Sequence, residues 1–243
     1  MATKVKIGSA RIDENGNARG GKAGDQTGIE VSMQNYYQHK KGWRVFRCVD
    51  PNKARLIADD MQYACGNSNI GYDQDQRTTL YNIAKEYNFN CSKVKTKCET
   101  DCSALVRVCC AYAGINLPNF TTVNEAQTLL DSEYFQEMIG DKYTKSPDYL
   151  KRGDILVTKT QGHTVIVLNN GQSANTDDGK FVVATGKSVN IRKEPSIDSM
   201  IIGIARWGDR FPFENELINN KWYMIQYHGI IGYISNKYSK VEE

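Results

Sequence analysis

The sequence lacks the features that mark several large classes of protein. None of its 243 residues lies in a run approaching the ~18 consecutive apolar residues of a membrane span. The opening stretch, MATKVKIGSARIDENG, has no apolar core of a signal peptide. Lys and Arg number 31 against 28 Asp and Glu, with no long run of either sign. We therefore expect a cytosolic product, without membrane insertion and without the concentrated basic face of a nucleic-acid binder.

Paired cysteine motifs are also missing. The seven cysteines all lie in the first half of the chain: Cys48, Cys65, Cys91, Cys98, Cys102, Cys109 and Cys110. An odd count cannot be used up by disulfides, and cytosolic cysteines are expected to be reduced and to pack as small apolar side chains. No CxxC pair occurs, and the spacing of the last four is unlike that of a zinc knuckle. We therefore expect no metal and no cofactor.

What is present indicates a soluble chain of two domains. Hydrophobic residues make up 40% and charged residues 24% of the sequence, close to globular averages. The length exceeds the ~100–200 residues of one usual domain. Residues 1 to about 30 are rich in Gly, Asn and Asp, which predicts a loop that wraps the core rather than building it. A strand is expected at 43–49.

Helices precede strands in the remainder of the first domain. Apolar residues recur at helical spacing over 51–64, 77–87, 101–114 and 124–130. The third of these is apolar on nearly every face and is expected at the centre of the domain. RGDILVTK and HTVIVL then read as two strands of an antiparallel sheet. The pattern predicts an α+β domain over 1–172.

A change of composition marks the second domain. Residues 173–181 are polar and contain glycine, as a linker does. Residues 182–243 hold short strand candidates separated by turn residues, and they contain no cysteine. This spacing is typical of a small all-β barrel.

Cys102 has a chemical setting of its own. It follows Asp101, a good N-cap residue, and so occupies the first turn of the central helix, where free N–H groups and the helix dipole favour a thiolate. Of the three histidines, His228 lies in the β half and His39 in a lysine-rich loop expected to be exposed. His163 opens the strand HTVIVL, where a rigid scaffold would present a base. Taken alone, these residues leave Cys102 open between a nucleophile and a core side chain.

The order of motifs from about residue 65 to residue 176 resembles the NlpC-type cell-wall cysteine peptidases, papain-like enzymes that cut the peptide stems of peptidoglycan. The motifs are DCSALV, GINLP, RGDILV and GHTVIVLNNG. The resemblance implies a papain-like α+β fold with Cys102 as the nucleophile and His163 as the base. Ala104 stands where the family usually has glycine.

In that family a third polar residue orients the histidine, and the resemblance implies Asn175 in this role, with Asp177 as the alternate. If the chain turns back at 169–171, Val165 faces Asn175, which then lies diagonal to His163 on the same face of the sheet. An asparagine that belongs only to the linker is the competing interpretation.

The resemblance also implies residues on the substrate and oxyanion side of the site, namely Tyr72, Asp101 and Ser103. Tyr72 resembles a tyrosine that precedes the nucleophile in the family. Here 30 residues separate it from Cys102, more than is usual, which indicates an inserted helix. An ordinary half-buried tyrosine is the alternative.

The opening segment GGKAGDQTGIEV resembles the N-terminal part of phage-type cell-wall amidases. Its polar residues Asp25, Gln26 and Glu30 either line the cleft or are only solvated.

The second domain resembles the bacterial SH3-like repeat, whose members tether lytic enzymes to cell walls. NIRKEPS, Gly-Asp, KWY and GYI follow one another in the order of that repeat within 182–243. We expect Trp222 in the core. The surface aromatics expected to form a peptide-binding groove are Tyr223, Tyr227 and Tyr233.

Together the two resemblances imply a bacteriophage endolysin, held in the host cytoplasm until release and acting on the peptidoglycan of a Gram-positive wall. The implied reaction is attack of Cys102 on an amide, proton delivery by His163, and hydrolysis of a thioester. Cleavage after D-glutamate, an endopeptidase activity, is favoured, and the bond from N-acetylmuramate to L-alanine, an amidase activity, stays open. A wall-binding protein with an inert first domain is the alternative of another class. The oligomeric state stays open too.

Overall fold

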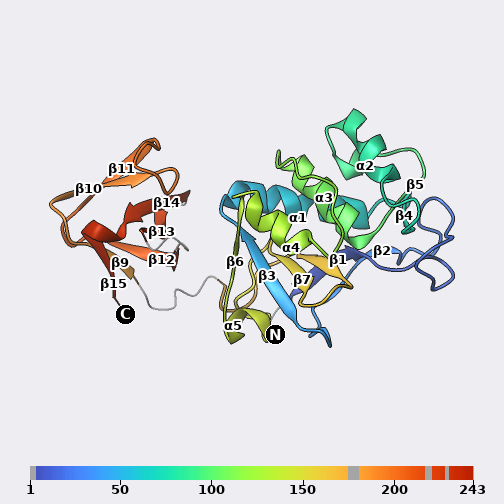
Figure 1. The fold of residues 1–243 in the computed structure, drawn as a ribbon, viewed down its shortest axis with the longest axis horizontal. Helices are drawn as coiled ribbons and strands as arrows, with labels where there is room; N and C mark the ends of the chain where they lie inside the picture. The colour runs from blue at the N-terminus through green and yellow to red at the C-terminus, as the bar shows by residue number, and fades with distance from the viewer. Residues whose placement is uncertain (1–3, 175–180, 217–220, 228–229, 243) are drawn as a thin grey trace. The chain divides into compact units, whose positions relative to one another are not determined.

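The computed structural model describes residues 4–174, 181–216, 221–227 and 230–242. It divides into two compact units, Met1–Ala174 and Asn175–Glu243, which are described separately (Figure 1). The first unit mixes helices and strands, and the second is built of strands with one short 3-10 helix, Asn236–Tyr238. The predicted order, an α+β domain followed by an all-β domain, is confirmed.

A six-stranded antiparallel sheet forms the centre of the first unit. Its strand order is β2-β1-β8-β7-β3-β6. The strands are β1 (Lys6–Ala10), β2 (Val31–Asn35), β3 (Trp43–Cys48), β6 (Phe135–Glu137), β7 (Ile155–Thr158) and β8 (Thr164–Val167). A separate pair of parallel strands consists of β4 (Ile70–Tyr72) and β5 (Cys98–Thr100).

The prediction that the N-terminal segment only wraps the core is wrong, because β1 and β2 belong to the main sheet. Ile7 is fully buried, and β1 pairs with β8 on one side and β2 on the other. The strand is hard to recognise because it contains Gly8, where a Cβ would lie 2.6 Å from the Met61 side chain. The small residue lets the helix carrying Met61 pack closely on the strand.

The helices are α1 (Pro51–Cys65), α2 (Thr79–Ala84), α3 (Cys102–Tyr112), α4 (Glu125–Asp131) and α5 (Asp141–Thr144). Two further 3-10 turns are Lys85–Tyr87 and Cys91–Lys93. The first four helices lie where the hydrophobic periodicity predicts them. Asp50 caps α1 by accepting hydrogen bonds from the backbone N–H groups of Asn52 and Lys53. Gly114, with a φ of +74°, follows the end of α3.

The central sheet is covered on both faces. Helices α1 and α3 pack against each other, α3 packs on β8, and α1 packs on β1. Fully buried Trp43 belongs to a second apolar cluster, with Val45, Leu156 and Val165. Among the described residues no helix is both long and apolar enough to cross a membrane.

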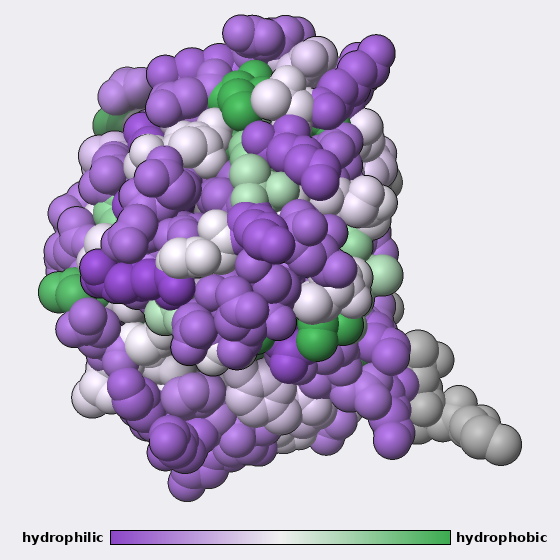
Figure 2. Space-filling model, turned by 90° about the vertical axis from the view of Figure 1, so that its right-hand side faces the viewer, coloured by the Kyte–Doolittle hydropathy of each residue, from purple (hydrophilic) through white to green (hydrophobic). Residues whose placement is uncertain are grey.

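The molecular surface on the face drawn in Figure 2 is mostly hydrophilic, with small separate hydrophobic spots.

The second unit is a seven-stranded antiparallel sheet with the order β11-β10-β14-β13-β12-β9-β15. Its strands are β9 (Phe181–Ala184), β10 (Ser188–Arg192), β11 (Ile201–Arg206), β12 (Arg210–Glu216), β13 (Trp222–Tyr227), β14 (Ile230–Ser235) and β15 (Ser239–Glu242). Its core cluster includes Val182, Val189, Ile191, Ile225 and Ile234. The predicted all-β domain is confirmed.

The aromatic residues of the second unit depart in part from expectation. Trp222 is buried, as predicted. Tyr233 is only 4% exposed, because it lies opposite Met224 and packs with Trp222, so its prediction as a surface aromatic is wrong. Tyr223 and Tyr227 are half-buried against the core. Trp207, which the sequence pattern did not single out, is 73% exposed.

We predict that Ile7→Ala destabilises the first unit by about 2–5 kcal/mol, because it leaves a cavity in the middle of the sheet. Met33→Ala on the neighbouring strand is the control, since Met33 is an exposed side chain and should change the free energy of unfolding by less than about 0.5 kcal/mol. Urea unfolding followed by the helical circular dichroism signal measures both. Equal stability of the two variants would contradict the placement of β1.

Candidate active site

Cys102 is the first residue of α3, immediately after the turn that follows β5. The Asp101 carboxylate accepts hydrogen bonds from the Ala104 N–H at 2.7 Å and from the Ser103 hydroxyl at 2.9 Å. Arg77 donates to Asp101, to the Ser103 hydroxyl at 3.0 Å and to the Phe120 carbonyl. The side chains of Asp101 and Ser103 therefore hold the start of the helix in place.

Tyr72 lies beside this helix start despite its distance in sequence. Strands β4 and β5 pair in parallel, with Tyr72 opposite Thr100, two residues before Cys102. Helix α2 and the two 3-10 turns lie between them in the sequence. Burial, and then the nearby Cys102, raise the pKa of Tyr72 to about 12, and the Gln74 amide donates to its hydroxyl at 3.1 Å.

His163 immediately precedes β8, at the end of the β7–β8 hairpin. Its backbone N–H donates to the Thr158 hydroxyl at 3.1 Å, and its carbonyl accepts from the Thr158 N–H at 3.0 Å. The backbone of the next residue, Thr164, lies close enough to Cys102 to lower the pKa of its thiol. The structure thus packs α3 against β8.

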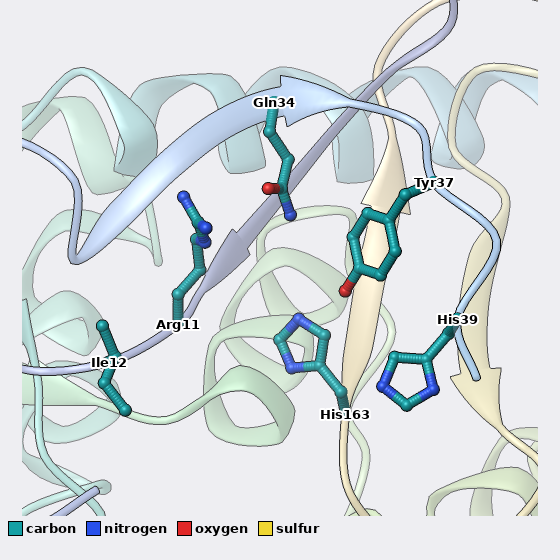
Figure 3. A pocket seen from close by; sticks show the side chains of 6 residues that line it. All are labelled: Arg11, Ile12, Gln34, Tyr37, His39 and His163. Atoms are coloured by element: carbon teal, nitrogen blue, oxygen red, sulfur yellow. The ribbon is translucent and has the colours of Figure 1, made fainter. Parts of the chain in front are cut away.

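A pocket of about 290 Å³ opens on the His163 side of this contact. We call it the His163 pocket, and its lining residues are Arg11, Ile12, Gln34, Tyr37, His39 and His163. Figure 3 shows the Tyr37 phenol reaching toward the two imidazole rings, while Arg11 and Gln34 extend toward the same space. Burial raises the pKa of Tyr37, and the neighbouring Arg11 lowers it.

Most of the lining residues of the His163 pocket were not found from the sequence. They follow β1 or lie on and after β2, so they were missed together with those strands. His39 was expected in an exposed loop, but its ring lies 5.2 Å from that of buried Trp43. The sequence feature that marks this part of the pocket is the spacing of tyrosine and histidine in YYQHKKGW, and this spacing alone does not indicate a site.

The expected third residue of the site, Asn175, and its alternate, Asp177, lie outside the described residues. The strand pairing invoked for Asn175 is wrong, because β8 pairs with β1 on one edge and β7 on the other. The segment after β8 runs elsewhere: the Gly171 N–H bonds the Leu150 carbonyl, and the Ser173 N–H bonds the Asp148 carbonyl. No antiparallel neighbour for His163 comes from that segment as far as Ala174.

The polar residues of the N-terminal loop fold the loop itself. The buried Glu30 carboxylate accepts from the N–H groups of Gln26 at 2.7 Å and Tyr72 at 3.1 Å. The Asp25 carboxylate accepts from the N–H groups of Thr27 and Gly28. None of Asp25, Gln26 and Glu30 is among the residues that line the His163 pocket.

The electrostatic setting of Cys102 differs from the expected thiolate. Burial raises the pKa of its thiol above the ordinary value, and Asp101 and Glu125 raise it further. Hydrogen bonds from the backbone of Thr164 and Ser103 lower the pKa, but they do not offset the burial. The expectation of a thiolate near neutral pH is therefore corrected to a protonated thiol.

His163 is neutral at the same pH. Burial, and to a smaller extent the nearby His39 and Arg11, lower its pKa to about 4. The resting site thus holds a neutral thiol and a neutral imidazole rather than an ion pair. A neutral imidazole retains the lone pair that a general base needs, so proton transfer must accompany attack by the sulfur.

Glu125 is a fully buried carboxyl group behind this contact. One of its oxygens accepts from the Thr164 hydroxyl at 2.8 Å, and the other has no hydrogen-bond partner among the described residues. Burial raises the pKa of Glu125 to about 8, so the group is protonated at pH 7. It holds the side chain of Thr164, whose backbone lies beside Cys102.

The other cysteines have the character of core residues. All seven are free thiols, and Cys91, Cys109 and Cys110 are completely buried, which raises their pKa values well above the ordinary thiol value. Within the described part of the chain no three or more His, Cys, Asp or Glu side chains are grouped as metal ligands. Cys102 differs from Cys91, Cys109 and Cys110 in its place at the start of α3, which packs on β8 next to His163.

The α+β unit, with a cysteine at a helix start and a histidine before a strand, matches a known protein family. Residues 7–174 match the endolysin-like domain, and residues 187–240 match the bacterial SH3 domain. Because the first match covers more than half of the chain, the protein belongs to the endolysin-like domain family, and it carries a C-terminal bacterial SH3 domain.

One solved structure to which the chain is similar is an NlpC/P60 family protein from Bacillus cereus. The two are 15% identical with a TM-score of 0.24, and the match covers 50% of this chain. It covers 43% of the Bacillus protein, so the chain spans less than half of that protein's length. No curated protein matches the chain.

We predict that Glu125→Gln speeds alkylation of Cys102 by iodoacetamide above pH 8 but not at pH 6. Glu125 carries no charge until the pH passes its raised pKa of about 8, and only the ionised carboxylate raises the pKa of Cys102. Peptide mapping after a short pulse of reagent measures the rate at each pH. Fast labelling of wild-type Cys102 at neutral pH would show instead that the thiol rests as a thiolate.

Proposed function

We propose that the protein is a peptidoglycan hydrolase that cleaves an amide bond of the wall stem peptide through Cys102 and His163. The observation that carries the proposal is the packing of α3, which begins at Cys102, against β8, which begins one residue after a histidine that lines an open pocket. Membership of the endolysin-like domain family supports the same reaction class.

In the proposed first half-reaction, the His163 imidazole accepts the thiol proton while the Cys102 sulfur attacks the amide carbon. The negative charge on the former carbonyl oxygen is stabilised by the Cys102 backbone N–H at the start of α3 and by the Tyr72 hydroxyl. The imidazolium then gives its proton to the leaving nitrogen, the carbon–nitrogen bond breaks, and a thioester with Cys102 remains.

In the second half-reaction, His163 takes a proton from a water molecule that attacks the thioester carbon. The carbon–sulfur bond breaks, the thiolate recovers the proton from the imidazolium, and a carboxylic acid leaves. The lowered pKa of His163, about 4, keeps the imidazole available as a base throughout the neutral range. A neutral imidazole can accept the thiol proton in the first half and the water proton in the second.

We favour cleavage after D-glutamate, which makes the enzyme an endopeptidase. Cleavage between N-acetylmuramate and L-alanine, an amidase activity, is the second candidate and uses the same chemistry. The third candidate, a wall-binding protein whose first unit is inert, would leave the Cys102–His163 arrangement without a role.

The second unit is proposed to hold the enzyme on its substrate. Its match to the bacterial SH3 domain supports binding to the peptidoglycan of a Gram-positive wall. Tyr223 and Tyr227 are partly accessible, and Trp207 is an exposed aromatic suited to stacking on a wall fragment. We further propose that the protein acts as a phage endolysin, which reaches the wall from the host cytoplasm after release.

Cys102→Ala should abolish lysis of purified Gram-positive walls, while binding to those walls is retained. The sulfur nucleophile is lost, but the second unit is untouched. The matched control is Cys109→Ala, the same change in the same helix at a completely buried position. Turbidity measures lysis and pelleting measures binding. Lysis retained by Cys102→Ala, or lost equally in both variants, would refute the assignment of the nucleophile.

Residues 175–243 expressed alone should fold without metal or disulfide and sediment with purified walls, because this unit has its own core and no cysteine. Trp207→Ala should weaken sedimentation without unfolding the fragment, since the side chain is exposed. If the fragment stays in the supernatant while the full chain pellets, wall binding resides elsewhere.

A further inference from the structure

Arg11 places a positive charge in the lining of the His163 pocket. Arg11 follows β1, in which Ile7 pairs with Val167 of β8 and Gly8 pairs with Ile166. Continued past the end of β1, the same register places Arg11 opposite His163. Its guanidinium makes one long hydrogen bond, 3.4 Å, to the Ser32 hydroxyl. Within the described residues Arg11 has no carboxylate partner at ion-pair distance.

The rest of the pocket lining leaves this charge uncompensated. None of the six lining residues is acidic. Burial lowers the pKa values of both His39 and His163, so both imidazoles are neutral at pH 7. Gln34 and Tyr37 add an amide and a hydroxyl group, which can donate further hydrogen bonds. The pocket is therefore suited to an anion of small size.

We propose that Arg11 binds a free carboxylate of the substrate peptide, next to the amide bond that is cleaved. The inference rests on the proposed function, because the pocket shares His163 with the reacting site and its ligand must belong to the same peptide. A guanidinium recognises a carboxylate through charged, paired hydrogen bonds.

The role assigned to Arg11 predicts which form of the stem peptide is cut. When D-glutamate is linked through its side chain, its α-carboxylate is free and lies close to the scissile amide. When that carboxylate is amidated, the charge is absent and the guanidinium keeps no anionic partner. Arg11 thus selects stems with the free acid over stems with the amide, and it favours the endopeptidase reaction over the amidase reaction.

The test compares two synthetic stem tetrapeptides, one with a free α-carboxylate on D-glutamate and one with the α-amide. Both are titrated by calorimetry into the Cys102→Ala protein, which cannot turn them over. The free acid should bind at least about tenfold more tightly, the scale of one charged hydrogen bond. Adding Arg11→Gln should remove the difference by weakening the acid alone, and Arg11→Lys should keep part of it.

Arg19→Gln is the matched control, since Arg19 is exposed and pairs with Asp75 away from the pocket. It should leave both affinities unchanged. Equal affinity for the two peptides, or a preference that survives Arg11→Gln, overturns the inference. Cleavage by the protein with Cys102 intact is measured separately: a preference without any cleavage supports Arg11 as the carboxylate site while refuting the proposed function.

Discussion

The candidate site depends on the contact between the first turn of α3 and the first residues of β8. Buried polar bonds hold both sides of this contact. Arg77 ties Asp101 and Ser103 at the helix start, and Glu125 holds the Thr164 hydroxyl at the strand start. In a buried environment such bonds are strong and permit few alternative arrangements. Cys102 is therefore positioned by the start of a helix, and His163 by its place next to the first residue of a strand.

Features with a local signal could be predicted from the sequence. The periodicity of apolar residues identifies the helices α1 to α4, and the pattern of short strands identifies the all-β unit. Cys102 and His163 were candidates because each stands at the beginning of an element whose start is marked, by Asp101 in one case and by Gly162 in the other. The same local logic places Asp101 as the helix cap.

Features that depend on distant pairing were not predictable in this way. The edge of β8 is occupied by β1, from the other end of the unit, so the pairing expected for Asn175 does not form. Arg11 and Tyr37 reach the pocket because of that same pairing. The charge state of Cys102 was also missed, since the helix start favours a thiolate locally, whereas burial and the neighbouring Asp101 oppose it.

The most direct test of the account is mass spectrometry of the fragments released when the protein digests purified Gram-positive walls. The account predicts stem fragments that end in D-glutamate, matched by new amino groups on the residue that followed it, and no release by Cys102→Ala. New amino groups on L-alanine would establish the amidase reaction instead. Fragments bearing only new sugar ends, or walls left intact, would contradict the central claim that Cys102 and His163 cleave the peptide stem.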